Sequence, residues 1–365
     1  MAKAIQLAHK GRFTTSPNPR VGCIIVDADN HVVGQGFHKE AGTPHAEVHA
    51  LRHAKHLAKG ATAYVTLEPC SHFGKTPPCA DALIDAKVSR VVVGMTDPNP
   101  QVSGRGIQKL RDAGIKVVSG VLAEQAAALN KGFIKRMVSG KPYVRVKLGI
   151  SLDGKIALGN GKSQWITGPM ARKDVQQYRA QSCAVLTGSG TVIADNPSLL
   201  VRANEAQFDE YPIDTLRQPA RVIVDSQRQV GRHHHCFNDG FTTYVACSPD
   251  KLSETDTLDN TGDNLIIVEE RGGHIDLSRL LEKLGEMQFN EIWVEAGPGL
   301  AGALLANAEV DELICYQAPK LLGDKGVSMV NLPTFTSLDE TISLSLVENR
   351  QVGNDIKLIY KPLNG

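Results

Sequence analysis

The sequence predicts two α/β domains that meet near residue 140. Short apolar runs alternate with helix-forming segments along the whole chain, an order typical of layered α/β folds. A length of 365 residues suggests two domains rather than one. The segment Val138–Pro142 breaks a long helical stretch and leads into an alternating strand. We therefore expect one domain at residues 1–140 and a second at residues 141–365.

Helix and strand signals alternate regularly through the first domain. Residues 1–10 have helical spacing, and Gly11 ends that element. The runs Val21–Val26 and His31–Phe37 flank a turn and predict a hairpin. Beyond the hairpin the sequence predicts strands at Ala61–Leu67, Arg90–Met95 and Ile115–Ser119, and helices at 45–58, Ala80–Ala86, Ile107–Ala113 and Ala123–Met137.

The second domain repeats this rhythm with more strands. It begins with the alternating strand Tyr143–Ile150 and ends with two strand-like runs, Ile342–Val347 and Ile356–Tyr360, which we expect to pair antiparallel. Between them the sequence predicts strands at Ala184–Thr187, Ala220–Asp225, Thr242–Ala246, Leu265–Glu269, Glu291–Glu295 and Leu313–Gln317, and helices at Ala171–Ala180, Leu277–Met287 and Leu300–Ala306.

The composition is that of an ordinary globular protein. Hydrophobic residues make up 42% and charged residues 22%, which excludes a disordered chain or a coiled coil. No apolar run approaches the roughly 18–20 residues of a membrane-spanning helix, and the N-terminus lacks a signal-peptide pattern. The 7 cysteines form no dense framework, which favours a reducing compartment. We expect a cytoplasmic protein that binds no membrane.

Charge is distributed unevenly between the two domains. Residues 1–140 carry 18 basic and 10 acidic side chains, a net +8, whereas the remaining residues carry 22 and 29, a net −7. A positive domain could attract an anionic small molecule or a nucleic acid. However, the sequence contains no basic run, the second half is acidic, and aromatic residues are only 5%. These features favour a small-molecule substrate over nucleic acid.

The strongest chemical signal is a set of metal-binding residues in the first domain. His45 is followed by Glu47, and Pro69-Cys70 is followed after eight intervening residues by Cys79. One imidazole and two thiolates form a three-ligand zinc site with a fourth position left for water, the catalytic pattern. Zinc lowers the pKa of that water to about 7. Glu47 can then take the proton from the water and pass it to a departing amine.

This signature is that of zinc deaminases, in which the second cysteine typically follows as Pro-Cys-x-x-Cys. The wider gap here could hold a substrate-binding loop. Two alternatives stay open at this point. The first is a nucleic-acid base deaminase with an accessory C-terminal domain. The second is a non-catalytic scaffold stabilised by zinc, with His72 as a fourth ligand.

A glycine-rich loop marks the second domain. Gly297-Pro-Gly299-Leu-Ala-Gly302 follows a predicted strand and opens a helix, where backbone N–H groups can hold a pyrophosphate. The loop lies late in its domain, so a tight turn that only packs a helix on a sheet is the alternative. Gly188-Ser-Gly190 is a second glycine turn after a strand. Two such turns on one sheet favour a nucleotide.

Together these residues resemble the bifunctional deaminase/reductase family of riboflavin biosynthesis, over nearly the whole chain. The motifs that carry the resemblance are Pro17–Gly22, His45–His49, Thr66–His72, Lys75–Cys79, Asp97–Pro100, Gly104–Gly106, Ser151–Lys155, Ser163–Thr167, Asp195–Pro197, Trp293–Gly297 and Ala318–Gly323. The family also has the eight-residue gap between its two cysteines. The resemblance implies a cytidine-deaminase-like αβα layered domain followed by a dihydrofolate-reductase-like α/β domain.

In this family the first domain deaminates 2,5-diamino-6-(5-phosphoribosylamino)pyrimidin-4-one, and the second reduces the ribosyl chain to ribityl with NADPH. By resemblance, zinc is held by His45, Cys70 and Cys79, with Glu47 catalytic, and the first pocket is lined by Asn18, His38, His72 and Lys75. We further expect a homo-oligomer.

The resemblance also implies two sets of residues in the second domain. Expected substrate contacts are Lys147, Ser163, Arg179, Leu199, Arg202 and Glu295. Expected NADP contacts are Gly149, Trp165, Thr191, Asp195, Ser226 and the loop Gly297, Pro298, Gly299, Leu300, Ala301, Gly302 and Ala303.

Overall fold

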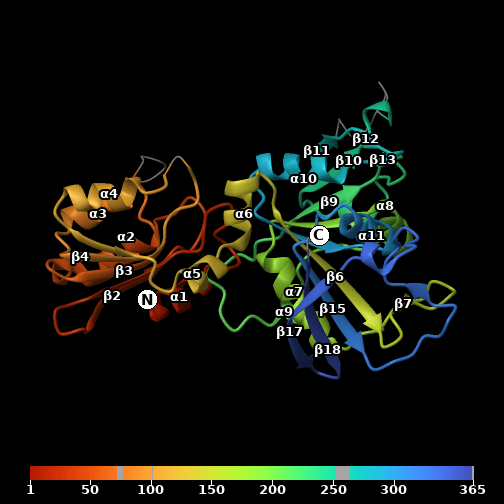
Figure 1. The fold of residues 1–365 in the computed structure, drawn as a ribbon, viewed down its shortest axis with the longest axis horizontal. Coiled ribbons are helices and arrows are strands. Elements are labelled where there is room, and N and C mark those ends of the chain that lie inside the picture. Colours follow the sequence, from red (N-terminus) through yellow and green to blue (C-terminus); the bar gives the residue numbers. More distant parts are fainter. Residues whose placement is uncertain (72–76, 101, 252–263, 364–365) are drawn as a thin grey trace. The chain divides into compact units, whose positions relative to one another are not determined.

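Two large sheets organise the chain, one in each of the two units into which it folds (Figure 1). The computed structural model describes all residues except 72–76, 101, 252–263 and 364–365. The first unit comprises Met1–Gly140 and Asp209–Arg217, and the second comprises Lys141–Phe208 and Gln218–Gly365. The first unit thus includes a short segment from far along the chain. There the ring of Tyr211 stacks on Phe13 with centroids 5.5 Å apart, and Arg217 Nε donates to the Phe13 carbonyl at 2.7 Å.

The sheet of the first unit has five strands in the order β2-β1-β3-β4-β5. β1 pairs antiparallel with β2 and β3, and β3, β4 and β5 are mutually parallel. The predicted hairpin and all three later strands are confirmed. Their bounds are β1 Gly22–Val26, β2 Val32–Phe37, β3 Thr62–Leu67, β4 Arg90–Met95 and β5 Lys116–Ser119.

Helices cover both faces of this sheet, as the alternation of side chains along β1 makes plain. Cys23 and Ile25 join the apolar core formed with α2, α3 and α4. Gly22 faces the opposite side, where a Cβ atom would lie 2.0 Å from the Ala4 carbonyl oxygen of α1. The arrangement is the predicted αβα layering. The helices are α1 Ala2–His9, α2 Ala46–Ala54, α3 Cys79–Asp85, α4 Arg105–Asp112, α5 Ala123–Ala128 and α6 Lys131–Ser139.

Two helices end earlier than their spacing predicts. The stretch Ala123–Met137 is not one helix but α5 and α6, divided at Asn130. The Asn130 side chain accepts from the Arg20 N–H at 2.7 Å and donates to the Arg20 carbonyl at 3.0 Å, which fixes Asn130 outside helical geometry. The predicted helix 45–58 ends at Ala54, because Lys55 adopts a φ of 52°, and a short 3₁₀ turn, η1 (Lys55–Ala58), follows.

The sheet of the second unit has nine strands in the order β11-β10-β9-β8-β14-β6-β15-β18-β17. Its strands are parallel from β11 to β15, and β18 and β17 complete it with antiparallel pairing, as predicted for the last two runs. The bounds are β6 Tyr143–Ser151, β8 Ala184–Gly188, β9 Ala220–Val224, β10 Thr243–Cys247, β11 Asn264–Ile267, β14 Glu291–Glu295, β15 Glu312–Ala318, β17 Leu344–Val352 and β18 Asp355–Pro362.

This sheet also packs helices on both faces. One face packs against α10 (Leu277–Glu286) and α11 (Pro298–Ala306). The other face, which includes Trp293 of β14, packs against Ala171 and Val175 of α7 (Pro169–Gln181). The structure adds elements that the sequence did not predict. They are β7 Lys155–Ala157, α8 Ser189–Asp195, α9 Ala203–Ala206, β12 Glu270–Arg271, β13 His274–Ile275, β16 Val327–Ser328 and the 3₁₀ turns η2 His235–Phe237, η3 Pro249–Lys251 and η5 Leu338–Glu340.

The sheet ends in an exposed strand. Every residue of β17 except Val352 is exposed, and Leu346 and Val347 keep about half of their surface exposed, 49% and 53%. β17 is the outermost strand of its sheet, so its outer edge has no strand partner in the described part of the chain.

Nowhere in the described part of the chain does a helix combine the length and the apolar character needed to cross a membrane.

Candidate metal centre and reductase pocket

The three predicted metal ligands meet at the ends of three elements of the first unit. His45 lies at the N-cap of α2, Cys70 follows β3, and Cys79 begins α3. The His45 Nδ1 atom lies 3.7 Å from Cys70 Sγ and 3.3 Å from Cys79 Sγ, and the three ligand atoms are all within 4.8 Å of one another. One imidazole nitrogen and two thiol sulfurs in this spacing fit a three-ligand zinc site.

The two cysteines shift each other's pKa in opposite directions. Hydrogen bonds with Cys79 and His45 lower the pKa of the Cys70 thiol to about 4. The pKa of Cys79 is raised by the same pairing with Cys70 and by burial. The backbone N–H of Cys79 also donates to Cys70 Sγ at 3.2 Å, at the first turn of α3. Donors that surround a sulfur in this way favour the thiolate form, which is the form that binds metal.

Glu47 lies one residue into α2, beside the ligand group. Its side chain is buried, with 3% of its surface exposed, and burial raises its pKa to about 7. A carboxyl group with a pKa near neutrality can accept and release a proton at physiological pH. The position and the pKa of Glu47 are therefore those of a proton-transfer group at the metal site.

Two further predicted pocket residues lie beside this centre. The His38 ring lies edge-on to the His45 ring at a centroid distance of 5.3 Å. Its Nδ1 lies 3.2 Å from the Pro44 carbonyl and its Nε2 lies 3.1 Å from Asn18 Nδ2, so Nδ1 donates and Nε2 accepts. Burial lowers the pKa of His38 to about 4, which keeps the ring neutral. The other two, His72 and Lys75, lie outside the described residues.

A buried carboxylate beside the cysteines was not predicted to have a role. Glu68 accepts four backbone N–H groups, from Asp97 and Gly104 on one oxygen and from Gly106 and Ile107 on the other, at 2.9–3.2 Å. A Cβ atom on Gly106 would lie 1.9 Å from the Pro69 carbonyl oxygen. Glu68 therefore ties the start of α4 to the turn that carries Cys70. In the sequence, the only sign of this role was that Glu68 lies within the motif Thr66–His72.

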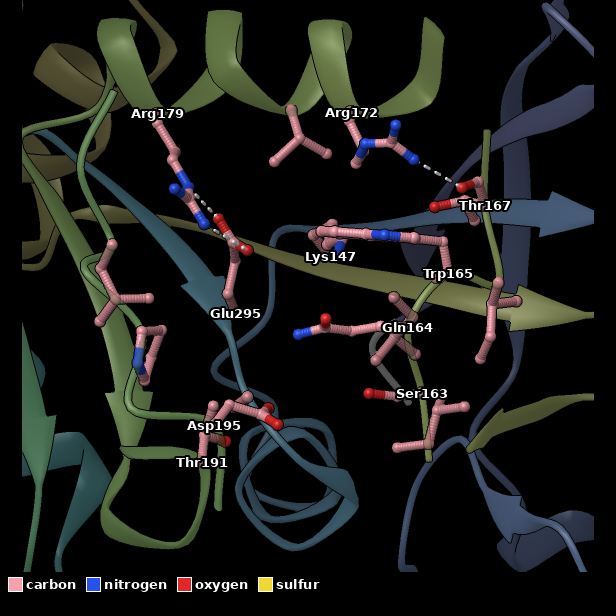
Figure 2. A pocket seen from close by; sticks show the side chains of 18 of the residues that line it. Lys147, Ser163, Gln164, Trp165, Thr167, Arg172, Arg179, Thr191, Asp195 and Glu295 are labelled. Carbon is pink, nitrogen blue, oxygen red and sulfur yellow. Dashed lines mark hydrogen bonds and ion pairs between the residues drawn. The ribbon is translucent and has the colours of Figure 1, made fainter. Parts of the chain in front are cut away.

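The second unit holds a pocket of about 430 Å³ at the carboxyl ends of its parallel strands (Figure 2). The carboxyl edge of a parallel sheet is where open α/β folds bind ligands. The pocket is lined from β6 by Lys147 and Gly149, from α8 by Thr191 and Asp195, and from the end of β14 and the N-cap of α11 by Glu295 and Gly297. Segments far apart in the sequence thus form one site.

Most of the predicted residues of the second domain line this pocket. All six expected substrate contacts do so: Lys147, Ser163, Arg179, Leu199, Arg202 and Glu295. Of the expected cofactor contacts, the lining includes Gly149, Trp165, Thr191, Asp195 and Gly297. Ser226 and the residues Pro298, Gly299, Leu300, Ala301, Gly302 and Ala303 are not part of the lining.

Packing explains the position of the glycine loop. Ala301 is fully buried in the core, and a Cβ atom on Gly302 would lie 1.9 Å from the Asn331 carbonyl oxygen, so this glycine is required for close packing. Gly297 instead lies at the N-cap of α11, where free backbone N–H groups suit a phosphate. Trp165 lines the pocket with 62% of its surface exposed, and its ring can stack on a flat ring. These features fit a dinucleotide cofactor.

Two of the predicted cations are held by acidic side chains. Arg179 donates from Nε and Nη2 to the two oxygens of Glu295, at 2.5 and 3.0 Å (Figure 2). Burial alone would raise the pKa of Glu295, but Arg179 lowers it to about 2. Arg202 makes a similar pair with Glu205, at 2.7 and 2.8 Å. Lys147 and Arg172, the other two cations of the lining, form no ion pair with the described residues, although the charge of Lys147 contributes to the lowered pKa of Glu295.

Arg172 is a pocket residue that the sequence did not single out. Its guanidinium lies 4.6 Å from the centroid of the Trp165 ring, and Nη1 donates to the Thr167 carbonyl at 3.1 Å (Figure 2). Arg172 thus holds the segment that carries Ser163 and Trp165. Its position on α7, one helix turn before Gln176 and two before Arg179, was the only sequence signal.

Two family models match the chain, one in each half. The cytidine and deoxycytidylate deaminase zinc-binding region matches residues 1–95, and the RibD C-terminal domain matches residues 142–358. The riboflavin biosynthesis protein RibD of Escherichia coli is 53% identical over 98% of this chain and 97% of its own length. RibD of Haemophilus influenzae is 49% identical over 99% of this chain and 96% of its own.

Solved structures agree with these matches. RibD of Acinetobacter baumannii superposes with a TM-score of 0.91 at 43% identity, covering 100% of this chain and 98% of that one. A diaminohydroxyphosphoribosylaminopyrimidine deaminase/5-amino-6-(5-phosphoribosylamino)uracil reductase from Thermotoga maritima superposes with a TM-score of 0.82 at 31% identity, covering 100% and 97%. The expected fold of both domains is thereby confirmed.

Proposed function

Since the chain belongs to the RibD family of riboflavin biosynthesis, and so is a deaminase and a reductase, we propose which of its residues carry each reaction. The nucleic-acid base deaminase and the zinc-stabilised scaffold are not favoured. The observation that carries the proposal is that predicted residues come together in each unit: His45, Cys70, Cys79 and Glu47 in one, and the pocket around Glu295 in the other.

In the first unit, His45, Cys70 and Cys79 would hold zinc, which supplies a water ligand with a pKa of about 7 when bound. Glu47, buried beside these ligands, takes a proton and returns it to the departing amino group of the pyrimidine. His38 is neutral and fixed by Pro44 and Asn18. His38 therefore presents no charge to the pyrimidine ring. The Asn18 amide still has a donor and an acceptor that can bind this ring.

In the second unit, NADPH would supply, when bound, the hydride that reduces the ribosyl chain. Trp165, Thr191, Asp195 and the N-terminus of α11 at Gly297 bind this cofactor. Lys147, Ser163, Arg202 and Glu295 bind the phosphorylated sugar. Lys147 is the best placed of them to neutralise a phosphate or a developing oxyanion, because Arg179 and Arg202 already pair with carboxylates.

We also propose the domain and assembly arrangement. The deaminase domain spans 1–140 and the reductase domain 141–365, with Asp209–Arg217 packed on the former. The exposed edge strand β17 can pair with a second copy, since unpaired strand edges are templates for association. We therefore propose a homo-oligomer that acts on a small molecule in the cytoplasm. Light scattering tests this arrangement, and L346K should shift an oligomer toward monomer.

A coupled assay tests the proposed function. The purified, zinc-loaded protein receives the diaminopyrimidinone ribosyl phosphate with and without NADPH, while ammonia release and nicotinamide absorbance are followed. We expect ammonia in both cases and NADPH oxidation only after deamination. Ammonia release without NADPH oxidation would contradict the roles proposed for the reductase residues. NADPH oxidation without ammonia release would contradict the roles proposed for the residues of the metal centre.

A further inference from the structure

The surroundings of Glu295 include one donor that has no assigned role. Trp293 and Glu295 lie two residues apart on β14, so both side chains point to the same face of the sheet, toward α7. The indole Nε1 of Trp293 donates to Glu295 Oε1 at 2.9 Å. Trp293 is fully buried, so its N–H has no access to water and Glu295 is its acceptor.

A count of lone pairs shows what this bond does to the carboxylate. Each carboxylate oxygen can accept about two hydrogen bonds. Oε1 accepts from Arg179 Nε at 2.5 Å and from Trp293 Nε1 at 2.9 Å, so it is saturated. Oε2 accepts from Arg179 Nη2 at 3.0 Å. Among the described residues no second donor reaches Oε2, and this oxygen keeps one acceptor direction in the pocket.

The indole is held rigidly on its other side. The Tyr178 ring stacks on it with centroids 4.6 Å apart and an interplanar angle of 7°. The Tyr178 hydroxyl accepts from Lys357 Nζ at 2.7 Å, and this buried ammonium pairs with Asp174 at 2.8 Å. Trp293 therefore cannot tilt away from Glu295 without disturbing a buried polar cluster.

We propose that Trp293 is a positioning residue of the reductase, which occupies Oε1 of Glu295 so that only Oε2 can accept a hydroxyl of the ribosyl substrate. A carboxylate with one free acceptor direction selects one hydroxyl in one orientation and so fixes the sugar against the hydride donor. The inference rests on the proposed function, in which Glu295 contacts the substrate.

Trp293→Phe tests the proposal, because phenylalanine keeps a ring on Tyr178 and lacks the N–H. We expect the KM for the deaminated ribosyl substrate to rise about tenfold, as for loss of a hydrogen bond to a charged group. The KM for NADPH and the rate of ammonia release should not change. Tyr178→Phe is the matched control: it removes the hydroxyl that accepts from Lys357 but keeps the stacked ring and the Trp293 N–H bond, so it should not raise the substrate KM.

A double-mutant cycle separates this proposal from the one on which it rests. If Glu295 contacts the substrate, Glu295→Gln raises the substrate KM, and adding Trp293→Phe to it changes little. A wild-type KM in Glu295→Gln would remove the substrate contact, and this inference with it. A Trp293→Phe variant with wild-type substrate KM, or with both KM values raised alike, would overturn only the positioning role.

A spectroscopic measurement covers the case in which Trp293→Phe fails to fold. The chain has 2 tryptophans, Trp165 and Trp293, so ¹⁵N-tryptophan labelling gives two indole N–H signals, which Trp165→Phe assigns. Ribose 5-phosphate added to the wild-type protein should shift the Trp293 signal as a hydroxyl engages Oε2. An unshifted Trp293 signal at a ribose 5-phosphate concentration that saturates inhibition of the reductase would overturn the proposal.

Discussion

Glu47 in the metal centre and Glu295 in the reductase pocket are both carboxylates removed from water, yet their acidities diverge. Burial raises the pKa of Glu47 to about 7, since the described structure places no Lys or Arg against it. Glu295 is also largely buried, but its pairing with Arg179 lowers its pKa to about 2. The first environment suits a group that exchanges protons, and the second suits a fixed anion that orients other groups. The difference teaches that the partner, rather than burial, decides the role.

The largest effect should come from removing the exchangeable proton. Glu47→Gln keeps the shape of the side chain and abolishes proton transfer, so ammonia release should fall by about 10²–10⁴-fold. Reduction of the already deaminated substrate should continue at the wild-type rate. Zinc content, measured by elemental analysis, should stay unchanged. Loss of zinc or of the fold in this variant would instead favour a structural role for the centre.

The next effect concerns the fixed anion. Arg179→Met leaves Glu295 buried without its ion-pair partner. Removing one partner of a buried pair lowers the free energy of unfolding by about 3–5 kcal/mol. Both tryptophans lie in the second unit, so tryptophan fluorescence during urea unfolding reports that unit alone. The matched control Arg179→Met/Glu295→Leu removes both charges and should recover part of the loss. A single variant as stable as wild type would contradict a dominant role for the pair.

The candidate zinc centre could be predicted from sequence because short motifs carry its residues. The predicted ligands lie at the starts of α2 and α3 and just after β3. The reductase pocket draws its residues from separate parts of the chain, and apart from the glycine loop that begins at Gly297 they were identified by resemblance to a family. Arg172, the Trp293–Glu295 bond and the Glu68 clamp depend on packing that spacing alone does not reveal. The break at Asn130 has the same origin, because its partner Arg20 is 110 residues away.

The acidity of Glu295 also predicts how stability depends on pH. Its pKa is lowered from 4.5 to about 2 on folding, so the ionised pair stabilises the second unit above about pH 4.5. That contribution is lost as the pH falls from 4.5 toward 2. The urea midpoint followed by tryptophan fluorescence should therefore decrease between pH 5 and pH 3. The decrease should be smaller in Glu295→Gln, and an equal decrease in both proteins would assign the effect to other carboxylates.

The smallest effect should come from a residue that acts on the pocket through its neighbour. Arg172→Met keeps an aliphatic chain over Trp165 but removes the cation–π contact and the bond to the Thr167 carbonyl. A contact of this kind at an exposed ring is worth about 0.5–1 kcal/mol, which corresponds to a roughly two- to fivefold rise in the KM for NADPH. Lys173→Met is the matched control, because Lys173 follows on α7 and donates to Gln207 without lining the pocket.

If both variants raise the KM for NADPH equally, the loss of one positive charge near the pocket is sufficient to explain the effect. If only Arg172→Met does so, the guanidinium orients the indole of Trp165. The reductase pocket would then owe its geometry to a second cation fixed by its neighbours, as Arg179 is fixed by Glu295. Among the described residues the metal centre has no such cation, and it is an anion, Glu68, that accepts the backbone N–H groups of Gly106 and Ile107 beside the turn that carries Cys70.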